Sequence, residues 1–557
     1  MNFRTFKALA VAAPLLVAAA ACTDPTVAPK STVTGSNIWN DQSSYAQYMA
    51  KLYGGLILTG QVGPNGNADI QQIDEGTSEY LRLYWYMQEL PTDEAVIGWN
   101  DPGVPELNKW QWTAGNTITK AMYARVYYQV VLANEFLRQT TLPLLVSRGV
   151  GSTLKAQVQQ YRAEARFLRA LAYWAGIDFY GSIPFVTEAD PIGGPPPKPA
   201  ARDSIYRYIV SELLSSEDSL PAASASTYGR ATPAAAHMLL AELYLNAGVY
   251  TPTPNYAAAQ AQADTVISLG GYGYSLAGTF RNNFTSDNNT SPEIIFSAVE
   301  DGNHTQTWGG MTFLVHAGCG GTMQASWFGM DYCWGGYRIK PEAFSLFSAG
   351  DSRASFIYDS VVAVDSTAAQ RSRDSIAFPT DTTKWTKIDH SVHYNVSDMG
   401  SFNFGAAAPK FTNKTSTGGP GQQTGMIDTD FPIFRLGEAY LIYAEAAVRT
   451  GNNVGQGVTY VNLLRQRAFG DATHNVTAGT MTLDTILAER GRELLFEARR
   501  RTDLIRFGLF TGGTYLWSWK GGTAAGAATS PNCALYQLPD NEITANTNLT
   551  QNPACYQ

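Results

Sequence analysis

Acidic residues and arginines alternate near the end of the chain in a pattern that could support acid–base chemistry. They recur three, four and seven residues apart, so a helix would place them in neighbouring stripes. The residues are Glu489, Arg490, Arg492, Glu493, Glu497, Arg500, Asp503 and Arg506. Glu493 and Glu497 would suit glycoside hydrolysis, which needs two carboxyl groups, one of them with a raised pKa. The many neighbouring guanidinium groups would instead keep both carboxylates ionised. We therefore predict no catalytic pair but structural ion pairs that hold the last helices together, made by Arg490, Glu493, Glu497, Arg500, Asp503 and Arg506.

Aromatic side chains gather among glycines in the middle of the chain. They are Trp308, Phe313, Trp327, Phe328, Tyr332, Trp334 and Tyr337. Sugars present apolar C–H faces, on which flat rings stack, and hydroxyl rims that amide and carboxylate groups bind. A disulfide between Cys319 and Cys333 would make this glycine-rich loop rigid, and exposed rings are costly unless they bind something. The alternative is that most of these rings are core residues that cover the helices.

A second aromatic cluster lies in a long segment before the helix predicted at 117–138. Its members are Tyr84, Trp85, Tyr86, Trp99, Asn100, Asp101, Trp110 and Trp112. Trp99, Asn100 and Asp101 combine a ring with polar neighbours, as a sugar site requires. From the two clusters we predict these ligand-binding residues: Trp308, Trp327, Tyr332, Trp334, Trp99, Asn100, Asp101 and Trp85. Trp327 and Trp334 are the first choices.

The remaining motifs and the composition weaken or exclude several classes of function. The chain has no GxSxG, GxxxxGK[ST], HExxH or EF-hand pattern, no CxxC spacing, and only six scattered histidines. We therefore predict no catalytic residue, no metal and no cofactor, apart from a covalent lipid on Cys22. The formal net charge is −8, and charged residues make up only 15% of the chain. The basic surface that binds nucleic acid is missing, so no nucleic-acid partner is expected.

Amphipathic helices must position these residues. Apolar residues recur at intervals of three and four between Leu154 and Ala172, with arginines and a glutamate between them, which predicts a helix. Thr232 and Pro233 are typical of a helix start, and Gly248 of its end. Further helices are predicted at 43–58, 117–138, 203–219, 256–269, 434–449, 457–467 and 483–506. The segment 273–430 is rich in Gly, Ser, Thr and Asn, which predicts loops with short strands at 293–298 and 356–364.

The helices also show a weak internal repeat. Ala241 and Glu242 precede Gly248 at the same spacing at which Ala444 and Glu445 precede Gly451. Helix–turn–helix units of this kind indicate tetratricopeptide-like pairs, which bury a continuous core only by stacking. Because 45% of the 557 residues are apolar, the chain can bury such a core, either as one large helical solenoid or as three or four ordinary domains.

The N-terminus resembles an export signal. Arg4 and Lys7 precede an apolar run at 8–21 that is too short to span a bilayer, as in a secretory signal peptide. Small residues stand directly before Cys22, as in the lipobox of bacterial lipoproteins. We therefore predict cleavage before Cys22 and a lipid on its thiol, with a plain signal peptide as the alternative.

Four cysteines then remain, an even number in an exported chain, which makes two disulfides plausible. Sequence proximity favours Cys319 with Cys333 and Cys533 with Cys555, although four cysteines allow three connectivities.

Several ordered segments resemble the signatures of the RagB/SusD family. They are YRAEARFLRALAYWAGIDFYGSIPFV at 161–186, FPIFRLGEAYLIYAEA at 431–446, YVNLLRQRA at 460–468 and ERGRELLFEARRRTDLIRFG at 489–508. GYRIKPEAFSLFSAGDSR at 336–353 and LPDNEITANTNLTQNP at 538–553 are similar to the central and closing motifs of the family. The resemblance implies an all-α fold of tetratricopeptide-like helix pairs beside an irregular, loop-rich ligand-binding region with short β-strands.

The same resemblance implies a function. Such a protein is a lipoprotein anchored in the outer membrane and facing the exterior, and it is not an enzyme. It captures an oligosaccharide and delivers it to a SusC-like TonB-dependent β-barrel transporter. One alternative is a helical-repeat protein that binds peptide or protein cargo for the same type of importer. Another is a glycoside hydrolase, against which the arginines around Glu493 and Glu497 count.

These expectations divide the chain as follows: a signal peptide at 1–21, a lipidated Cys22 and tether to residue 42, and a single domain at 43–557. Within the domain, the helical parts are expected at 43–270 and 431–510, the ligand-binding part at 271–430 and a closing segment at 511–557.

Overall fold

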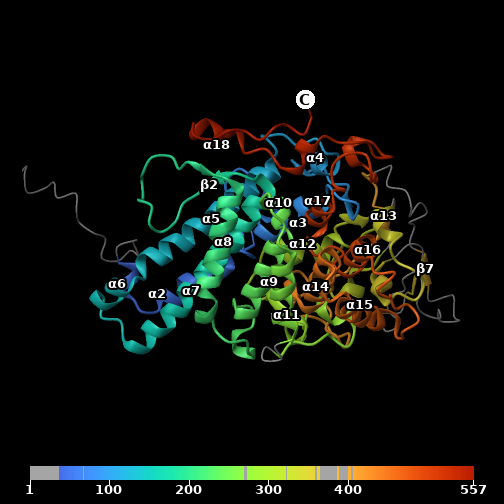
Figure 1. The fold of residues 1–557 in the computed structure, drawn as a ribbon, viewed down its shortest axis with the longest axis horizontal. Helices are drawn as coiled ribbons and strands as arrows, with labels where there is room; N and C mark the ends of the chain where they lie inside the picture. The colour runs from blue at the N-terminus through green and yellow to red at the C-terminus, as the bar shows by residue number, and fades with distance from the viewer. Residues whose placement is uncertain are drawn as a thin grey trace, which may run out of the picture.

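Stacked helices form the framework of the molecule (Figure 1). The computed structural model describes residues 37–556 except 65, 67, 269–272, 322, 358–360, 364–384, 388–398, 403 and 404. The predicted signal peptide and Cys22 lie outside the described residues. No helix among the described residues combines the length and the apolar character that crossing a membrane requires.

Successive helices pack against one another across the framework. The helices are α5 (Thr117–Gln139), α7 (Ser152–Tyr180), α8 (Arg202–Ser216), α9 (Pro233–Leu245), α11 (Tyr256–Ser268), α14 (Leu436–Thr450), α15 (Val454–Phe469) and α16 (Leu483–Glu493). Helix α5 packs against α7, α7 against α8, α9 against α11, α11 against α14, and α14 against α15. Figure 1 shows this row running from the teal helices through the green to the orange ones. The predicted all-α, tetratricopeptide-like fold is confirmed.

Helix α9 begins where the sequence predicts but ends earlier than predicted. The Thr232 hydroxyl accepts a hydrogen bond from the Ala235 N–H at 3.4 Å, and Pro233 is the first helical residue, as predicted. The helix ends at Leu245, however, and Gly248 lies inside the short helix α10 (Ala247–Tyr250). The predicted end at Gly248 was therefore wrong.

The predicted helix at 483–506 is interrupted. It forms α16 and α17 (Arg500–Arg506), and between them Phe496 and Ala498 adopt left-handed backbone conformations, with φ of 62° and 59°. Tertiary contacts satisfy the backbone groups that leave the helix: the Phe496 N–H donates to Glu94 at 2.9 Å, and the Phe496 carbonyl accepts from the Trp85 indole at 3.1 Å. These distant partners override the local helical pattern.

A buried ion-pair network joins these helices to the rest of the chain. Arg435 donates to Glu493 at 2.8 Å and to Glu497 at 2.7 Å, while Arg353 reaches Glu493 at 3.0 Å and Lys410 reaches Glu497 at 2.5 Å. Burial alone would raise the pKa of Glu493, but the surrounding guanidinium groups outweigh it and lower that pKa. Neither carboxylate is exposed to a ligand, so the pair does not resemble a glycosidase centre.

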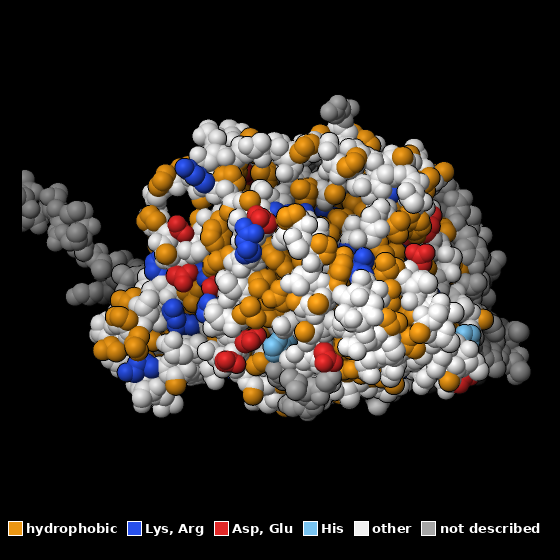
Figure 2. Space-filling model, in the orientation of Figure 1, with side chains coloured by type: hydrophobic (Ala, Val, Ile, Leu, Met, Phe, Trp, Pro, Cys, Tyr) orange, Lys and Arg blue, Asp and Glu red, His pale blue; other side chains and the backbone are white. Residues whose placement is uncertain are grey.

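The other predicted ion-pair residues take part in the same way. Further pairs are Arg490 with Asp503 at 2.7 Å, Arg500 with Asp93 at 2.6 Å, and Arg506 with Glu445 at 2.7 Å. Because these charges are buried, few remain for the surface. Figure 2 accordingly shows Lys, Arg, Asp and Glu side chains scattered in small groups over a mainly uncharged face.

The chain contains further, mostly short helices. The helices are α2 (Ser44–Gly54), α3 (Tyr80–Glu89), α4 (Val104–Asn108), α6 (Leu142–Ser147), α12 (Gly310–Ala317), α13 (Pro341–Phe344) and α18 (Asp540–Ala545). Of these, only α2 lies where a helix was predicted. Helices α3 and α12 pack against each other. The second aromatic cluster therefore begins on helix α3, and Phe313 of the first cluster lies on helix α12.

Short antiparallel ladders connect distant segments. β4 (Ile294–Ala298), predicted at 293–298, pairs with β9 (Phe431–Arg435), and β2 (Ile183–Pro184) pairs with β3 (Pro199–Ala200). β6 (Val361–Ala363) pairs with β7 (Trp385–Lys387), and β6 covers part of the strand predicted at 356–364. A three-stranded sheet has the order β1 (Ala95–Ile97), β5 (Tyr337–Ile339), β8 (Ala406–Ala407). This sheet determines how the two aromatic clusters meet.

Candidate ligand-binding site

The β1–β5 ladder brings the two aromatic clusters together. Ile97 pairs with Tyr337 in antiparallel register, so the residues after β1 lie beside the residues before β5. The rings of Trp99 and Trp334 are consequently 6.3 Å apart between centroids. A Cβ on Gly336 would lie 2.8 Å from the Trp99 ring, so this approach requires glycine.

Four side chains form a surface that we call the aromatic surface: Trp99, Trp308, Tyr332 and Trp334. The three tryptophans are half-buried, and Tyr332 is 44% exposed. Trp334 lies at the centre, with the rings of Trp308 and Tyr332 each 6.3 Å away between centroids. Partly exposed rings at this spacing offer flat apolar faces to a ligand while their other faces remain packed.

Helix α12 supports Trp334 from below. The His316 ring stacks on Trp334 at 4.9 Å, and Nδ1 of His316 donates to the Tyr332 carbonyl at 2.8 Å. Burial lowers the pKa of His316, and because a carbonyl oxygen can only accept, Nδ1 carries a proton in this hydrogen bond. The Trp334 N–H donates to the His316 carbonyl at 2.9 Å, which fixes the backbone beneath the ring.

Helix α3 supports the other two tryptophans through Arg82. This buried guanidinium lies 4.5 Å from the Phe313 ring centroid and 5.8 Å from that of Trp99, and it donates to the Trp308 carbonyl at 3.2 Å. Glu79 caps α3 by accepting from the Leu81 and Arg82 N–H groups. Neither Arg82 nor His316 was predicted as a site residue, because neither belongs to a motif and only the packing of α3 against α12 brings them under the rings.

Both disulfides join the cysteines that sequence proximity favours. Cys319 is bonded to Cys333 directly before Trp334, and Cys533 to Cys555 in the closing segment. The first disulfide links the end of α12 to the aromatic surface, and the Gly335 N–H adds a hydrogen bond to the Cys319 carbonyl at 2.8 Å.

Two of the predicted ligand-binding residues are buried, and their prediction was wrong. Trp85 is 0% exposed on α3, where all ten residues are buried, and its ring packs edge-on against Phe313 and Phe496. Trp327 is 1% exposed in the short 3₁₀ helix η7 (Ala325–Phe328). Large rings on helices are drawn into the core because burying them gains most hydrophobic free energy there.

The other predicted ligand-binding residues are accessible. Trp99, Trp308, Tyr332 and Trp334 form the aromatic surface, while Asn100 is exposed and Asp101 half-buried beside Trp99. Their role in binding stays a prediction. No cluster of three or more His, Cys, Asp or Glu side chains is suited to hold a metal within the part of the chain that the structure describes.

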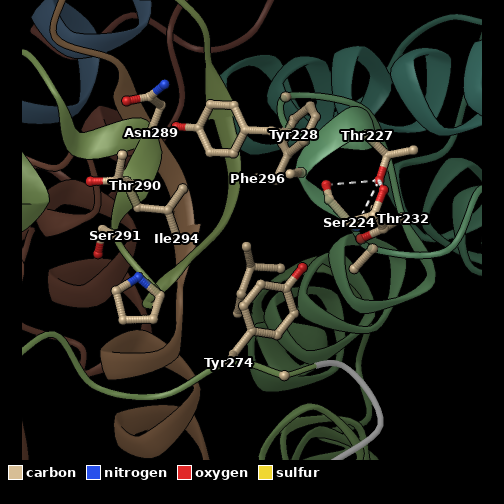
Figure 3. Close-up of a pocket in the computed structure, with 16 residues that line it drawn as sticks. Ser224, Thr227, Tyr228, Thr232, Tyr274, Asn289, Thr290, Ser291, Ile294 and Phe296 are labelled. Atoms are coloured by element: carbon tan, nitrogen blue, oxygen red, sulfur yellow. Dashed lines mark hydrogen bonds between the residues drawn. The ribbon is translucent and has the colours of Figure 1, made fainter.

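A cavity of about 580 Å³ lies beside β4, away from the aromatic surface (Figure 3). Many of its polar groups are already engaged within the protein. Tyr228 donates to Asp430 at 2.5 Å, the Thr227 hydroxyl accepts from the Ser224 N–H at 2.8 Å, and Ser291 donates to an asparagine at 2.6 Å. Such groups have less capacity to bind a ligand, so the aromatic surface is the better candidate site.

Stacked helix pairs that carry an open aromatic surface are suited to a binding protein. Comparison with known sequences indicates the same class. A family model described as "SusD family" matches residues 292–554, and one described as "Starch-binding associating with outer membrane" matches residues 86–245. The starch-binding protein SusD of Bacteroides thetaiotaomicron is 33% identical over 532 residues, which cover 90% of both chains. The chain belongs to the SusD family.

Solved structures share the fold. A SusD superfamily protein from Parabacteroides distasonis aligns with a TM-score of 0.68 at 20% identity, over 94% of this chain and 99% of the other. Surface glycan-binding protein A from Bacteroides thetaiotaomicron, solved with laminarihexaose, aligns with a TM-score of 0.65 at 19% identity, over 92% and 99%.

Proposed function

We propose that the protein is a glycan-binding lipoprotein of the outer-membrane surface. It captures an oligosaccharide on the aromatic surface and delivers it to a SusC-like TonB-dependent transporter. The observation that carries this proposal is the group of partly exposed rings around Trp334, held from below by His316 and Arg82. Rings fixed in this way lose little conformational freedom when a ligand binds, which favours affinity.

The ligand that we propose is an α-linked glucose oligosaccharide derived from starch. The support is the starch-binding relative, which resembles this chain along nearly its whole length. The surface glycan-binding protein bound to laminarihexaose is also a glucan binder, but its lower identity makes it a guide to the fold alone. The half-buried Asp101 and the exposed Asn100 beside Trp99 supply acceptors and donors for sugar hydroxyls.

The arrangement of carboxyl groups favours binding without hydrolysis. Glu493 and Glu497 are buried in ion pairs, and Glu79 and Glu300, which lie beneath the aromatic surface, are buried as well. Glu79 and Glu300 accept hydrogen bonds from the Gly310 and Met311 N–H groups at the start of α12. Retaining glycosidases need two carboxyl groups that flank the scissile bond, and none of these four carboxyl groups is accessible to one.

Native affinity electrophoresis tests the proposal. The mature chain without its lipid, residues 23–557, is run through gels that contain starch, laminarin or other plant and microbial polysaccharides. We expect retardation by starch, which Trp334→Ala weakens about tenfold to thirtyfold because a buried ring contact is lost. Tyr332→Ala should weaken binding less, since Tyr332 lies at the edge of the surface.

Tyr556→Ala serves as the matched control, because Tyr556 is 42% exposed but lies outside the aromatic surface. It should leave retardation unchanged. If laminarin alone retards the protein, the proposed ligand is wrong but the proposed site still stands. An absence of retardation by every polysaccharide would reject glycan binding and favour peptide or protein cargo.

A further inference from the structure

A hollow of about 250 Å³ adjoins the aromatic surface at Trp99. Its lining includes Trp99, Asn100, Lys109, Met399 and Trp519. We propose that this hollow is a second saccharide subsite, which binds the units of a longer chain that extend beyond the aromatic surface. The proposal rests on the proposed function and deepens it, because it makes binding depend on the length of the oligosaccharide.

The two sites share Trp99. Its ring lies 6.3 Å from Trp334 on the aromatic surface and also lines the hollow. A saccharide that stacks on Trp334 and Trp99 can therefore extend directly into the hollow. At about 250 Å³, slightly below the range of about 300–1,000 Å³ that encloses a drug-sized ligand, the hollow has room for one or two sugar units.

Trp519 provides a second aromatic ring in the lining of the hollow. Its ring is partly buried and packs against Val96 and Met399, so it is held in place while one part faces solvent. Its backbone is left-handed, with φ of 71°, a conformation that residues other than glycine rarely adopt. Strained backbone of this kind concentrates where function requires a particular side-chain position. Here the strain accompanies the placement of an aromatic ring in the lining of the hollow.

The polar groups of the hollow are available to a ligand. Lys109 lies 5.9 Å from the Trp519 ring centroid, and its ammonium makes no hydrogen bond or ion pair with any described residue. The exposed Asn100 amide likewise has no hydrogen-bond partner in the described ranges. Together they offer donors and an acceptor at the rim of two rings, whereas many of the polar groups of the larger cavity in Figure 3 are engaged within the protein.

Isothermal titration with maltotriose and maltoheptaose tests this subsite on the mature chain, residues 23–557. We expect wild type to bind maltoheptaose about tenfold more tightly than maltotriose, since the longer chain gains a further stacked ring. Trp519→Ala should remove most of that difference by weakening maltoheptaose binding, with little change for maltotriose. Trp519→Phe, which keeps a ring, should restore most of it.

Leu516→Ala is the matched control, because Leu516 is 42% exposed in the same segment and does not line the hollow. It should behave as wild type, and thermal unfolding of each variant shows that the fold is retained. Equal affinity of wild type for both sugars would overturn the subsite alone. So would an equal loss of both affinities in Trp519→Ala. If no maltooligosaccharide and no polysaccharide binds, the proposed function fails, and the subsite fails with it.

Discussion

Because Gly336 is a glycine and has no side chain, Trp99 can lie close to its backbone in the aromatic surface. A Cβ there would lie 2.6 Å from the Ala317 Cβ and 2.8 Å from the Trp99 ring. We therefore expect Gly336→Ala to cost about 1–3 kcal/mol of stability, the range for overpacking, and to weaken glycan binding by displacing Trp99. Chemical denaturation and affinity electrophoresis measure the two effects.

Gly455→Ala is the control for this substitution. Gly455 lies inside α15, no atom would come within 4 Å of a Cβ at this position, and its φ is not positive. Alanine there should stabilise the protein by up to about 1 kcal/mol through helix propensity and leave binding unchanged. A Gly336→Ala protein as stable as wild type and equally able to bind would show that Trp99 can move without consequence.

Residue type alone could not separate site rings from core rings. Trp85 and Trp334 belong to similar aromatic runs, yet Trp85 is buried and Trp334 is half-exposed. The difference comes from α3, which buries every one of its residues between α5 and α12, an environment that only the tertiary structure creates. Asn100 and Asp101 remain accessible beside Trp99, and their role in binding stays a prediction.

At the scale of elements, the two disulfides make separable contributions. Each closes a short loop, with sequence separations of 14 and 22, and the chain-entropy model assigns about 3 kcal/mol to a loop of this size. We expect the double variants Cys319→Ser/Cys333→Ser and Cys533→Ser/Cys555→Ser to lose similar stability. Only the first variant should weaken glycan binding, because only its disulfide adjoins Trp334. The loss should be no more than a few-fold, since backbone hydrogen bonds still hold Trp334. Equal binding losses would contradict this assignment.

Because the ion-pair network is buried, the stability of the protein falls at acidic pH. Burial alone would raise the pKa of Glu489, but Arg353, Arg492 and Arg465 outweigh it and lower that pKa to about 2. The folded protein therefore binds its proton less readily than the unfolded chain, so the stabilisation is complete above about pH 4.5 and is lost as the pH falls towards 2. For Glu489 this amounts to about 3 kcal/mol. Denaturation midpoints at pH 7, 5 and 3 measure the decline.

Glu489→Gln tests the origin of that decline. The variant should be less stable than wild type at pH 7 and should lose less further stability on acidification. Glu135→Gln is the control, because Glu135 forms a partly exposed pair with Arg138 on α5, and such pairs contribute about 0–1 kcal/mol. Parallel pH curves for wild type and Glu489→Gln would mean that other groups control acid stability.

Helices with a regular apolar period could be predicted from the sequence, and those governed by distant contacts could not. Helix α7 follows its three-and-four spacing and extends beyond the predicted residues to Gly181, whose φ of 73° ends it. The region at 483–506 has a similar spacing but breaks, because Glu94 and Trp85 bind the backbone of Phe496. Such partners, far away in the sequence, leave no local pattern.

At the scale of the whole molecule, the proposed lipid anchor would make membrane attachment depend on Cys22. We expect Cys22→Ser to move the protein from the membrane fraction to the soluble fraction, because each buried lipid methylene contributes about 0.8 kcal/mol to anchoring. Thr23→Ala is the control and should remain in the membrane fraction. A membrane-bound Cys22→Ser protein would instead point to another means of attachment. From detergent extracts, the wild-type protein should co-purify with a large β-barrel.

The β1–β5 ladder has a consequence for finding the ligand. The rings of Trp99 and Trp334 meet only when this ladder of three residue pairs has formed, so the unfolded chain has no binding site. Any sugar that binds must then raise the melting temperature, by an amount equivalent to about 2.7 kcal/mol at a hundred times its dissociation constant. The melting curve of the protein can thus serve as a label-free sensor with which a library of oligosaccharides of every linkage is searched.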